Sequence, residues 1–408
     1  MVRIVNINAA EQPRLHPQPG SPRWIPRLGH GQQRLAPLLA SRGVTMTASP
    51  LHFAAHNPQL TLFTGGESRL GLVLDPCTHL RQLPPASRSK AFRALPFGGE
   101  SAPFDPERDP IDERGLLALV TSTLDCQRAA GATLLLSPFH LVGAVGTRGR
   151  DLDLQLARLA CEHFHSQRMD EPSDLGQLPL RRELYMTIAV SKELLDAPRA
   201  LLALAEACLG LPVSGFWVKL EGFSQRTSRR RIRAGAGFLA ALALDGRPVV
   251  SCGAGQLHLG LLVNDISTSL GLAEGEHFHL PEVRAERDWS GGRTRTVYHQ
   301  KYLRSFRVGA DSAARAFRAS PCRCRRHRAD LPPEKGAVDE HCAVIRAKEA
   351  VEALDGQVPV RREWLLASTA LASHLAHDCG VDFTPPAVYE ALFEGIDAAQ
   401  AGRPAATG

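Results

Sequence analysis

The fold is decided by a stretch that contains VSGFWVKLEG at residues 213–222, RRRIRAGAGFLAALALDG at 229–246 and PVVSCGAG at 248–255. The first and third segments are short apolar runs. The second carries apolar residues at helical spacing and ends at a glycine, so the order is strand, helix, strand. Because the strands are apolar throughout rather than alternating, both of their faces are expected to be covered, which is typical of a parallel sheet.

The same alternation extends in both directions from this stretch. Further helices are predicted at 115–131, 151–168 and 197–210, and further strands at 132–138, 183–191 and 265–271. Repeated strand–helix units fit either a doubly wound sheet or a (β/α)8 barrel. The dinucleotide fingerprint GxGxxG is absent, because the glycine turn at 253–255 continues with Gln256, Leu257 and His258. Length and repeat number favour an α/β fold of the (β/α)8 TIM-barrel type.

Composition divides the chain further. We expect a flexible N-terminal lead-in at 1–50, the barrel at 51–307, a basic Cys/His module at 308–342, C-terminal helices at 343–394 and a disordered tail at 395–408. The segment 59–75 is expected to supply early strands, as a hairpin or two strands around Gly65 and Gly66.

The 408 residues are 44% hydrophobic and 22% charged, which is typical of a globular protein. No apolar run is long enough to span a bilayer and the N-terminus lacks an apolar secretory segment, so a soluble, cytoplasmic protein is expected. The nine cysteines are odd in number and dispersed, which excludes a disulfide framework. The net charge of +6 is compatible with RNA or DNA as a partner without requiring one.

In a barrel, the chemical groups lie at the carboxyl ends of the strands. Lys219 and Glu221 lie two residues apart in an apolar strand, so they share one face, and their charges need a partner or a ligand. We therefore predict a catalytic role for the Glu221 carboxylate and a substrate-binding role for Lys219. Ser251, at the end of the next strand, is a further candidate for substrate binding.

Gly253 and Gly255 follow that strand, and glycines let a backbone approach a phosphate or a planar base closely. Both are therefore predicted to bind substrate, although a tight turn into the next helix fits equally well. Arg229 and Arg230 begin a helix, where cations oppose the helix dipole unless an anion lies nearby. They are candidate contacts to a phosphate or a nucleic-acid backbone, with a solvated arginine-rich surface as the alternative.

The sharpest local motif is Cys322-Arg-Cys324-Arg-Arg-His327, which is followed by His341 and Cys342. Thiolates and imidazoles within a short span suit a tetrahedral zinc ion. Cys322, Cys324 and His327 can supply three ligands, and either His341 or Cys342 the fourth. A structural zinc is predicted here, with a basic loop that carries incidental Cys and His residues as the alternative.

This order of motifs resembles the tRNA-guanine transglycosylases and their DNA-modifying relatives. The resemblance implies a (β/α)8 barrel with a zinc subdomain late in the chain. It implies that the turn at 253–255 corresponds to the family's Gly-x-Gly strand end, and that Asp265 corresponds to the Asp nucleophile of the following strand. In the family's Cys-x-Cys-x-x-Cys motif, His327 stands at the third cysteine, and His341 stands for the distant histidine.

The sequence therefore predicts a transglycosylase-like barrel protein that acts on a nucleobase in RNA or DNA, by base exchange or a related glycosyl transfer. Asp265 and Glu221 would supply the carboxylates for nucleophilic or general-base work. Two alternatives stay open. One is a catalytically degenerate barrel that binds nucleic acid or a partner protein, and the other is a barrel enzyme that acts on a small metabolite.

Overall fold

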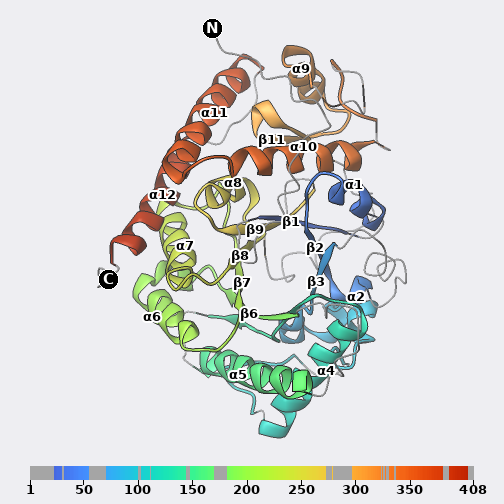
Figure 1. The fold of residues 1–408 in the computed structure, drawn as a ribbon, viewed down its shortest axis with the longest axis vertical. Coiled ribbons are helices and arrows are strands. Elements are labelled where there is room, and N and C mark those ends of the chain that lie inside the picture. The colour runs from blue at the N-terminus through green and yellow to red at the C-terminus, as the bar shows by residue number, and fades with distance from the viewer. Residues whose placement is uncertain are drawn as a thin grey trace.

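The computed structural model of the protein shows an α/β barrel followed by a β-hairpin and C-terminal helices (Figure 1). It describes residues 23–29, 32–54, 70–99, 103–110, 112–143, 148–169, 182–272, 278, 296–322, 324, 327, 330–334, 337–379 and 386–402.

Eight parallel strands form a closed barrel. In order around the ring they are β1 (Trp24–Arg27), β2 (Met46–Pro50), β3 (Gly71–Asp75), β4 (Leu134–Leu136), β6 (Glu183–Val190), β7 (Gly215–Leu220), β8 (Val249–Cys252) and β9 (Ser267–Gly271). The ring closes where β1 pairs with β9. The short β5 (Leu141–Val142) pairs only with the far end of β6, while β4 and β6 pair directly. This confirms the predicted (β/α)8 TIM-type fold.

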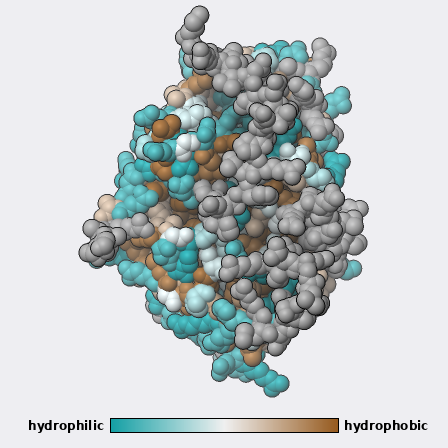
Figure 2. Space-filling view, in the orientation of Figure 1, coloured by the Kyte–Doolittle hydropathy of each residue, from teal (hydrophilic) through white to brown (hydrophobic). Residues whose placement is uncertain are grey.

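Helices surround the ring of strands (Figure 1). They are α1 (Ala36–Ala40), α2 (Leu51–Ala54), α3 (Lys90–Arg93), α4 (Glu113–Ala129), α5 (Arg148–Met169), α6 (Pro198–Leu209), α7 (Arg229–Leu242) and α8 (His258–Leu262). Polar side chains cap two of them: Asp112 accepts from the backbone N–H of Gly115 in α4, and Ser228 accepts from that of Arg231 in α7. The surface over α5 is mostly hydrophilic (Figure 2), as expected for the outer face of an amphipathic helix.

Two hydrophobic layers hold the barrel together. Ile25, Val73 and Trp217 belong to the core inside the ring. Phe216 and Val218 belong to the larger core between the strands and the helices. Neighbouring residues of a strand therefore alternate between the two layers, and every second side chain points into the barrel.

After β9 the chain leaves the barrel. β10 (Thr296–His299) and β11 (Arg304–Arg307) form an antiparallel hairpin, followed by α9 (Asp311–Ala319), α10 (Val338–Ala353), α11 (Val358–Asp378) and α12 (Pro386–Ala401). The helix α10 contacts β10 on one side and α1 and α8 on the other, and α12 packs along α7 (Figure 1). Within the described residues, no helix has both the length and the apolar sequence that crossing a membrane requires.

The structure corrects two boundaries that composition predicted. The range 1–50 contains the barrel strands β1 and β2, so its described part is not a flexible lead-in. Residues 395–401 continue α12, where Ile396 is buried, and do not belong to a disordered tail. In the segment 59–75, β3 occupies 71–75, and the predicted turn at Gly65 and Gly66 lies outside the described residues.

The packing of α12 on α7 depends on Gly395, because a Cβ atom there would clash with the carbonyl oxygen of Arg233. We expect Gly395→Ala to lower the free energy of unfolding by about 1–3 kcal/mol, the usual cost of overpacking. The matched control is Gly402→Ala, where an added Cβ would have its nearest heavy atom at 3.7 Å. This control should change stability by no more than about 0.5 kcal/mol. Urea denaturation measures the free energy of unfolding of both variants. Equal stability of Gly395→Ala and Gly402→Ala would contradict the close packing of α12 on α7 at Gly395.

Candidate active site and metal centre

Lys219 and Asp75 form an ion pair inside the barrel mouth, the end of the barrel at which the carboxyl ends of the strands lie. Lys219 follows the inward-facing Trp217 by two residues, and Asp75 follows the inward-facing Val73 in the same way. Lys219 Nζ lies 2.5 Å from Asp75 Oδ2, and both side chains are buried. The predicted substrate-binding residue Lys219 therefore lies inside the mouth, with Asp75 as its partner.

The surroundings keep the Asp75 carboxyl group ionised. Burial raises the pKa of Asp75, but the Lys219 ammonium and the Arg27 guanidinium outweigh it and hold the net pKa well below its usual range. Burial also lowers the pKa of His79 well below its ordinary value, and Lys219 lowers it further, so the imidazole is neutral. The barrel mouth thus offers a carboxylate, an ammonium and a neutral imidazole.

The backbone beside Asp75 has an unusual conformation. Cys77 has a φ of 54°, in the left-handed region that residues other than glycine rarely adopt. Its backbone N–H donates to Asp75 Oδ1 at 3.0 Å. Burial raises the pKa of the Cys77 thiol to about 12, so the thiol stays protonated and is no nucleophile at neutral pH. Such backbone strain is concentrated at functional sites, where the surrounding structure sustains it.

Aromatic rings surround the ammonium group of Lys219. Its Nζ lies 4.6 Å from the ring centroid of Phe139, which follows β4, and 5.4 Å from that of Phe278, which follows β9. His79 stacks on Phe139 with ring centroids 5.0 Å apart and meets the Phe278 ring edge-on at 5.3 Å. The mouth therefore combines a charged pair with flat apolar surfaces, which suits a planar polar ligand.

Several buried polar atoms in the same region have no hydrogen-bond partner among the described residues. They are His79 Nδ1, Ser269 Oγ, Thr187 Oγ1 and Trp217 Nε1. The strand registers place Ser269 level with Lys219, through Cys252, and Thr187 level with Trp217, one layer deeper. Buried polar groups are normally paired, so these atoms indicate a site for a ligand with several hydrogen-bonding groups.

A buried histidine–carboxylate pair lies at the end of β4. His140 Nδ1 is 2.8 Å from Asp153 Oδ1 of α5, and the backbone N–H of His140 donates to the same carboxylate. His140 Nε2 is buried and has no partner within the described chain. The pair fixes the orientation of an imidazole beside the mouth.

The predicted catalytic residue Glu221 and the predicted substrate-binding residues Ser251, Gly253 and Gly255 lie close to the mouth in different orientations. Glu221 is half-buried on the rim, where its Oε2 accepts from the backbone N–H of Lys192 at 3.2 Å. Gly253 and Gly255 have φ values of 71° and 54° and form the turn at the carboxyl end of β8. Ser251 stands in register with Val218, so it faces the helices and not the interior, which corrects its assignment to substrate binding.

Asp265 lies at the opposite end of the barrel, in the turn that precedes β9. Its side chain is 52% exposed, and its Oδ1 accepts from Arg361 Nη2 at 2.9 Å. Because all strands are parallel, the residues before β9 lie at the amino ends of the strands, away from Asp75 and Lys219. The structure therefore corrects the assignment of Asp265 as a catalytic carboxylate.

The predicted phosphate contacts lie at the first turn of α7, on the mouth side of the barrel because this helix follows β7. Arg230 donates to the backbone oxygen of Asp196 at 2.7 Å, and Arg231 pairs with the Asp196 carboxylate. Arg229 is exposed. The Asp196 carboxylate therefore neutralises Arg231, whereas Arg229 and Arg230 are both exposed to solvent.

The Cys/His motif forms a compact group. Cys322, Cys324, His327 and His341 each offer one ligand atom, and these atoms lie within 4.8 Å of one another. Cys324 Sγ lies 3.0 Å from His327 Nδ1 and 3.1 Å from His341 Nδ1, and Cys322 Sγ lies 4.0 Å from His341 Nδ1. Ligands of a tetrahedral ion with ordinary metal–sulfur and metal–nitrogen bonds are about 3.6 Å apart. The four predicted residues can therefore hold a metal ion.

His341, and not Cys342, is the fourth residue of the group, because α10 directs the His341 side chain toward Cys324. His341 Nε2 donates to the backbone oxygen of Tyr298 at 2.7 Å, which leaves Nδ1 as the ligand atom. Metal-binding histidines are commonly fixed by such a bond on their second nitrogen.

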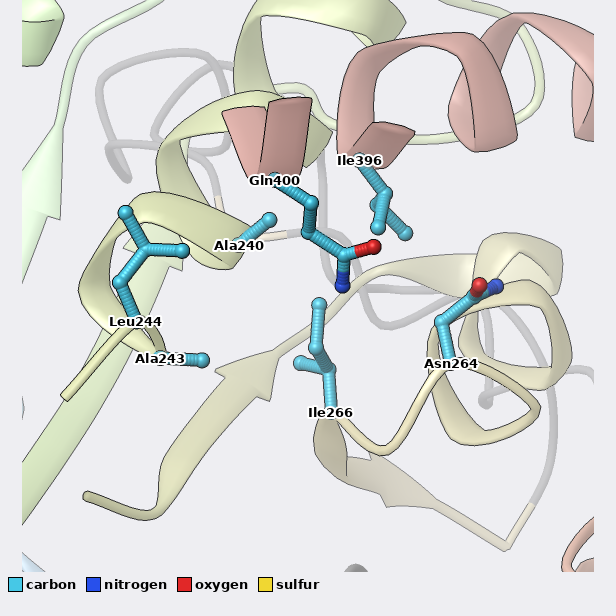
Figure 3. Close-up of a pocket in the computed structure, with 7 residues that line it drawn as sticks. All are labelled: Ala240, Ala243, Leu244, Asn264, Ile266, Ile396 and Gln400. Carbon is cyan, nitrogen blue, oxygen red and sulfur yellow. The ribbon is translucent and has the colours of Figure 1, made fainter. Parts of the chain in front are cut away.

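A small pocket lies outside the barrel, between α7, α12 and the turn before β9 (Figure 3). Its lining consists of Ala240, Ala243, Leu244, Asn264, Ile266, Ile396 and Gln400. It contains no titratable group, and Asn264 is already bonded to Gly260 and Arg362. The barrel mouth is therefore the candidate active site.

No protein-family model matches the sequence, and a search of curated proteins finds no match. Function must therefore be inferred from the mouth and the metal centre. The sequence interpretation missed Asp75 and His79. Asp75 could be found by the rule that selected Lys219, because it is a carboxylate that ends an apolar strand, whereas no such signal marks His79, which lies in the turn after that strand.

Removing one ligand should abolish metal binding. We expect purified wild-type protein to hold about one metal ion per chain, and Cys324→Ser to hold less than about 0.1. Cys342→Ala, which alters a buried cysteine next to His341 but outside the group, should retain the ion. Elemental analysis measures all three, and equal metal content in both variants would contradict the assignment.

Removing Lys219 should destabilise the fold, because the buried Asp75 carboxylate would lose its partner. Because its folded-state pKa is depressed, Asp75 stabilises the fold above its unfolded pKa, and this contribution is lost as pH falls through the folded pKa. Lys219→Met leaves the carboxylate without its partner and should lower the free energy of unfolding by about 3–5 kcal/mol near neutral pH.

In the Lys219→Met variant, burial should raise the pKa of Asp75. The difference in free energy of unfolding between wild type and variant should therefore become smaller from about pH 7 to about pH 5, as the carboxyl group takes up a proton. The control is Lys192→Met, which removes an exposed pair with Glu193 at 3.9 Å and should cost no more than about 1 kcal/mol. Urea denaturation at both pH values tests this, and a deficit that stays constant would contradict the ionised pair.

Proposed function

We propose that the protein is an enzyme that binds a nucleobase in the barrel mouth and exchanges or transfers it at a glycosidic bond in RNA or DNA. The observation that carries the proposal is the buried pair of Lys219 and Asp75 beneath the rings of Phe139 and Phe278. A flat base can stack on these rings. Its polar edge can meet Asp75 and the unpartnered Nδ1 of His79.

The roles follow from the charges. In a glycosidic exchange the departing base leaves with the electron pair of the broken bond, and the sugar carbon becomes positive. The Asp75 carboxylate would stabilise or attack that carbon, and the Lys219 ammonium would stabilise the departing base. An incoming base then forms the new bond to the sugar carbon while any bond between that carbon and Asp75 breaks, and the incoming base gives up one proton to balance the proton that the departing base takes up. Asp75 thus takes the role that the sequence assigned to Asp265.

A polynucleotide partner is supported by exposed cations on the segment that follows the barrel. They are Lys301, Arg307, Arg315 and Arg318. Most of the basic run at 323–328 lies outside the described residues. Together with Arg229 at the mouth, these groups suit the phosphates of RNA or DNA. We further propose that the metal is zinc, because two thiolates and two imidazoles form a common structural zinc site that stabilises the fold of its own segment.

The proposal can be tested by comparing how Asp75 and Asp265 each affect the rate of base exchange. Asp75→Asn removes the charge at the mouth and should lower the rate of base exchange by about 100-fold or more. Asp265→Asn alters the exposed residue at the other end of the barrel and should leave the rate within about twofold. The measurement is incorporation of labelled guanine into RNA and DNA, with calorimetric binding of guanine as a second readout. Full activity of Asp75→Asn, or the absence of base binding by the wild type, would contradict the proposal.

A further inference from the structure

A continuous chain of buried polar groups leaves the metal centre on the side of His341. His341 Nε2 donates to the backbone oxygen of Tyr298 at 2.7 Å. The hydroxyl of the same tyrosine donates to Glu349 Oε1 at 2.6 Å. His341 and Glu349 both belong to α10, and Tyr298 belongs to β10. The metal ligand is thus joined to a buried carboxylate two turns further along the same helix.

The chain continues from Glu349 toward the barrel. Arg346 Nη1 donates to Glu349 Oε2 at 3.2 Å and to His258 Nε2 at 2.9 Å. The guanidinium carbon of Arg346 lies 3.5 Å from the ring centroid of Tyr298. Each of these side chains is buried. Arginine can only donate, so His258 Nε2 must be the acceptor.

This assignment fixes the next bond. With Nε2 as acceptor, the neutral His258 carries its proton on Nδ1, which donates to the backbone oxygen of Gly255 at 3.0 Å. Burial and the adjacent Arg346 lower the pKa of His258 well below its ordinary value, which agrees with a neutral ring. All donors and acceptors from His341 to Gly255 are therefore consistent with one protonation state.

The chain ends at the turn that borders the candidate active site. Gly253 and Gly255 both hold left-handed backbone conformations, and the N–H of Gly253 donates to the oxygen of Ser269 at 3.0 Å. Cys252, directly before the turn, stands in register with Lys219. A displacement of the Gly255 carbonyl would therefore move the edge of the mouth next to Lys219.

A buried arginine–glutamate pair costs desolvation energy, and apolar residues of similar size can replace such pairs without loss of stability. Its presence here needs a reason beyond stability. We propose that the Tyr298–Glu349–Arg346–His258 chain is a positioning device, by which metal binding at Cys322, Cys324, His327 and His341 fixes the turn at 253–255. This inference rests on the proposed metal centre but not on the identity of the substrate.

The test is amide hydrogen exchange of the full chain, first freed of metal by a chelator and then loaded with zinc chloride. In the wild type, zinc should slow exchange in peptides that cover 253–258 by about 5- to 100-fold, the usual range of coupling between two sites. Tyr298→Phe removes one hydroxyl and keeps the backbone oxygen that His341 uses. This variant should bind zinc, slow the exchange around His341, and lose the response at 253–258.

Tyr302→Phe is the matched control, because its buried hydroxyl contacts Cys379 and lies outside the chain. It should respond like the wild type. Glu349→Gln, which removes the charge paired with Arg346, should reproduce the loss seen with Tyr298→Phe and serves if that variant does not fold. A response at 253–258 that survives in Tyr298→Phe, or is missing in the wild type despite bound zinc, would overturn the inference. Failure to bind zinc would instead overturn the metal centre, and neither result depends on base exchange.

Discussion

The parallel pairing of β1 with β9 closes the sheet, and the position of each candidate functional group depends on that closure. Trp24 to Arg27 run in register with Thr268 to Gly271. A closed ring of parallel strands brings all carboxyl ends to one end of the barrel and turns every second side chain inward. Asp75 and Lys219, on strands that are not neighbours, reach each other across the interior for this reason.

The ion pair of Lys219 and Asp75 lies in one layer of the barrel interior. Below it the interior is built mostly from apolar and aromatic side chains, among them Val73, Leu134 and Val250, and Thr187 adds a hydroxyl one layer deeper. Above it lie the rings of Phe139 and Phe278. A ligand in this space would meet charge on one edge and apolar surface on its faces, which constrains both its chemistry and its orientation. The segment after β9 is tied to the same region, because α10 carries a metal ligand near one end and contacts to the barrel further along.

The sequence predicted those parts of the fold that depend on local pattern. Apolar runs and terminal glycines located most strands and helices from residue 115 onward, and the spacing of three Cys and His residues located the metal centre. The pairing of Asp75 with Lys219 could not be predicted from the sequence, because the two residues are 144 positions apart and neither segment indicates its partner. The strands β1 and β2 were not predicted, because they are short, contain proline and lie in a polar, arginine-rich part of the sequence. Asp265 was misplaced because it precedes β9 instead of following it, so it lies at the amino ends of the strands and not at the mouth.

We propose that the layer formed by Asp75 and Lys219 is the binding site for a planar base. A crystal structure of the protein soaked with guanine tests it most directly. A flat ligand should lie against Phe139, with its polar edge within hydrogen-bond distance of Asp75 and of His79 Nδ1. Guanine bound elsewhere, or an unchanged mouth at saturating guanine, would contradict it.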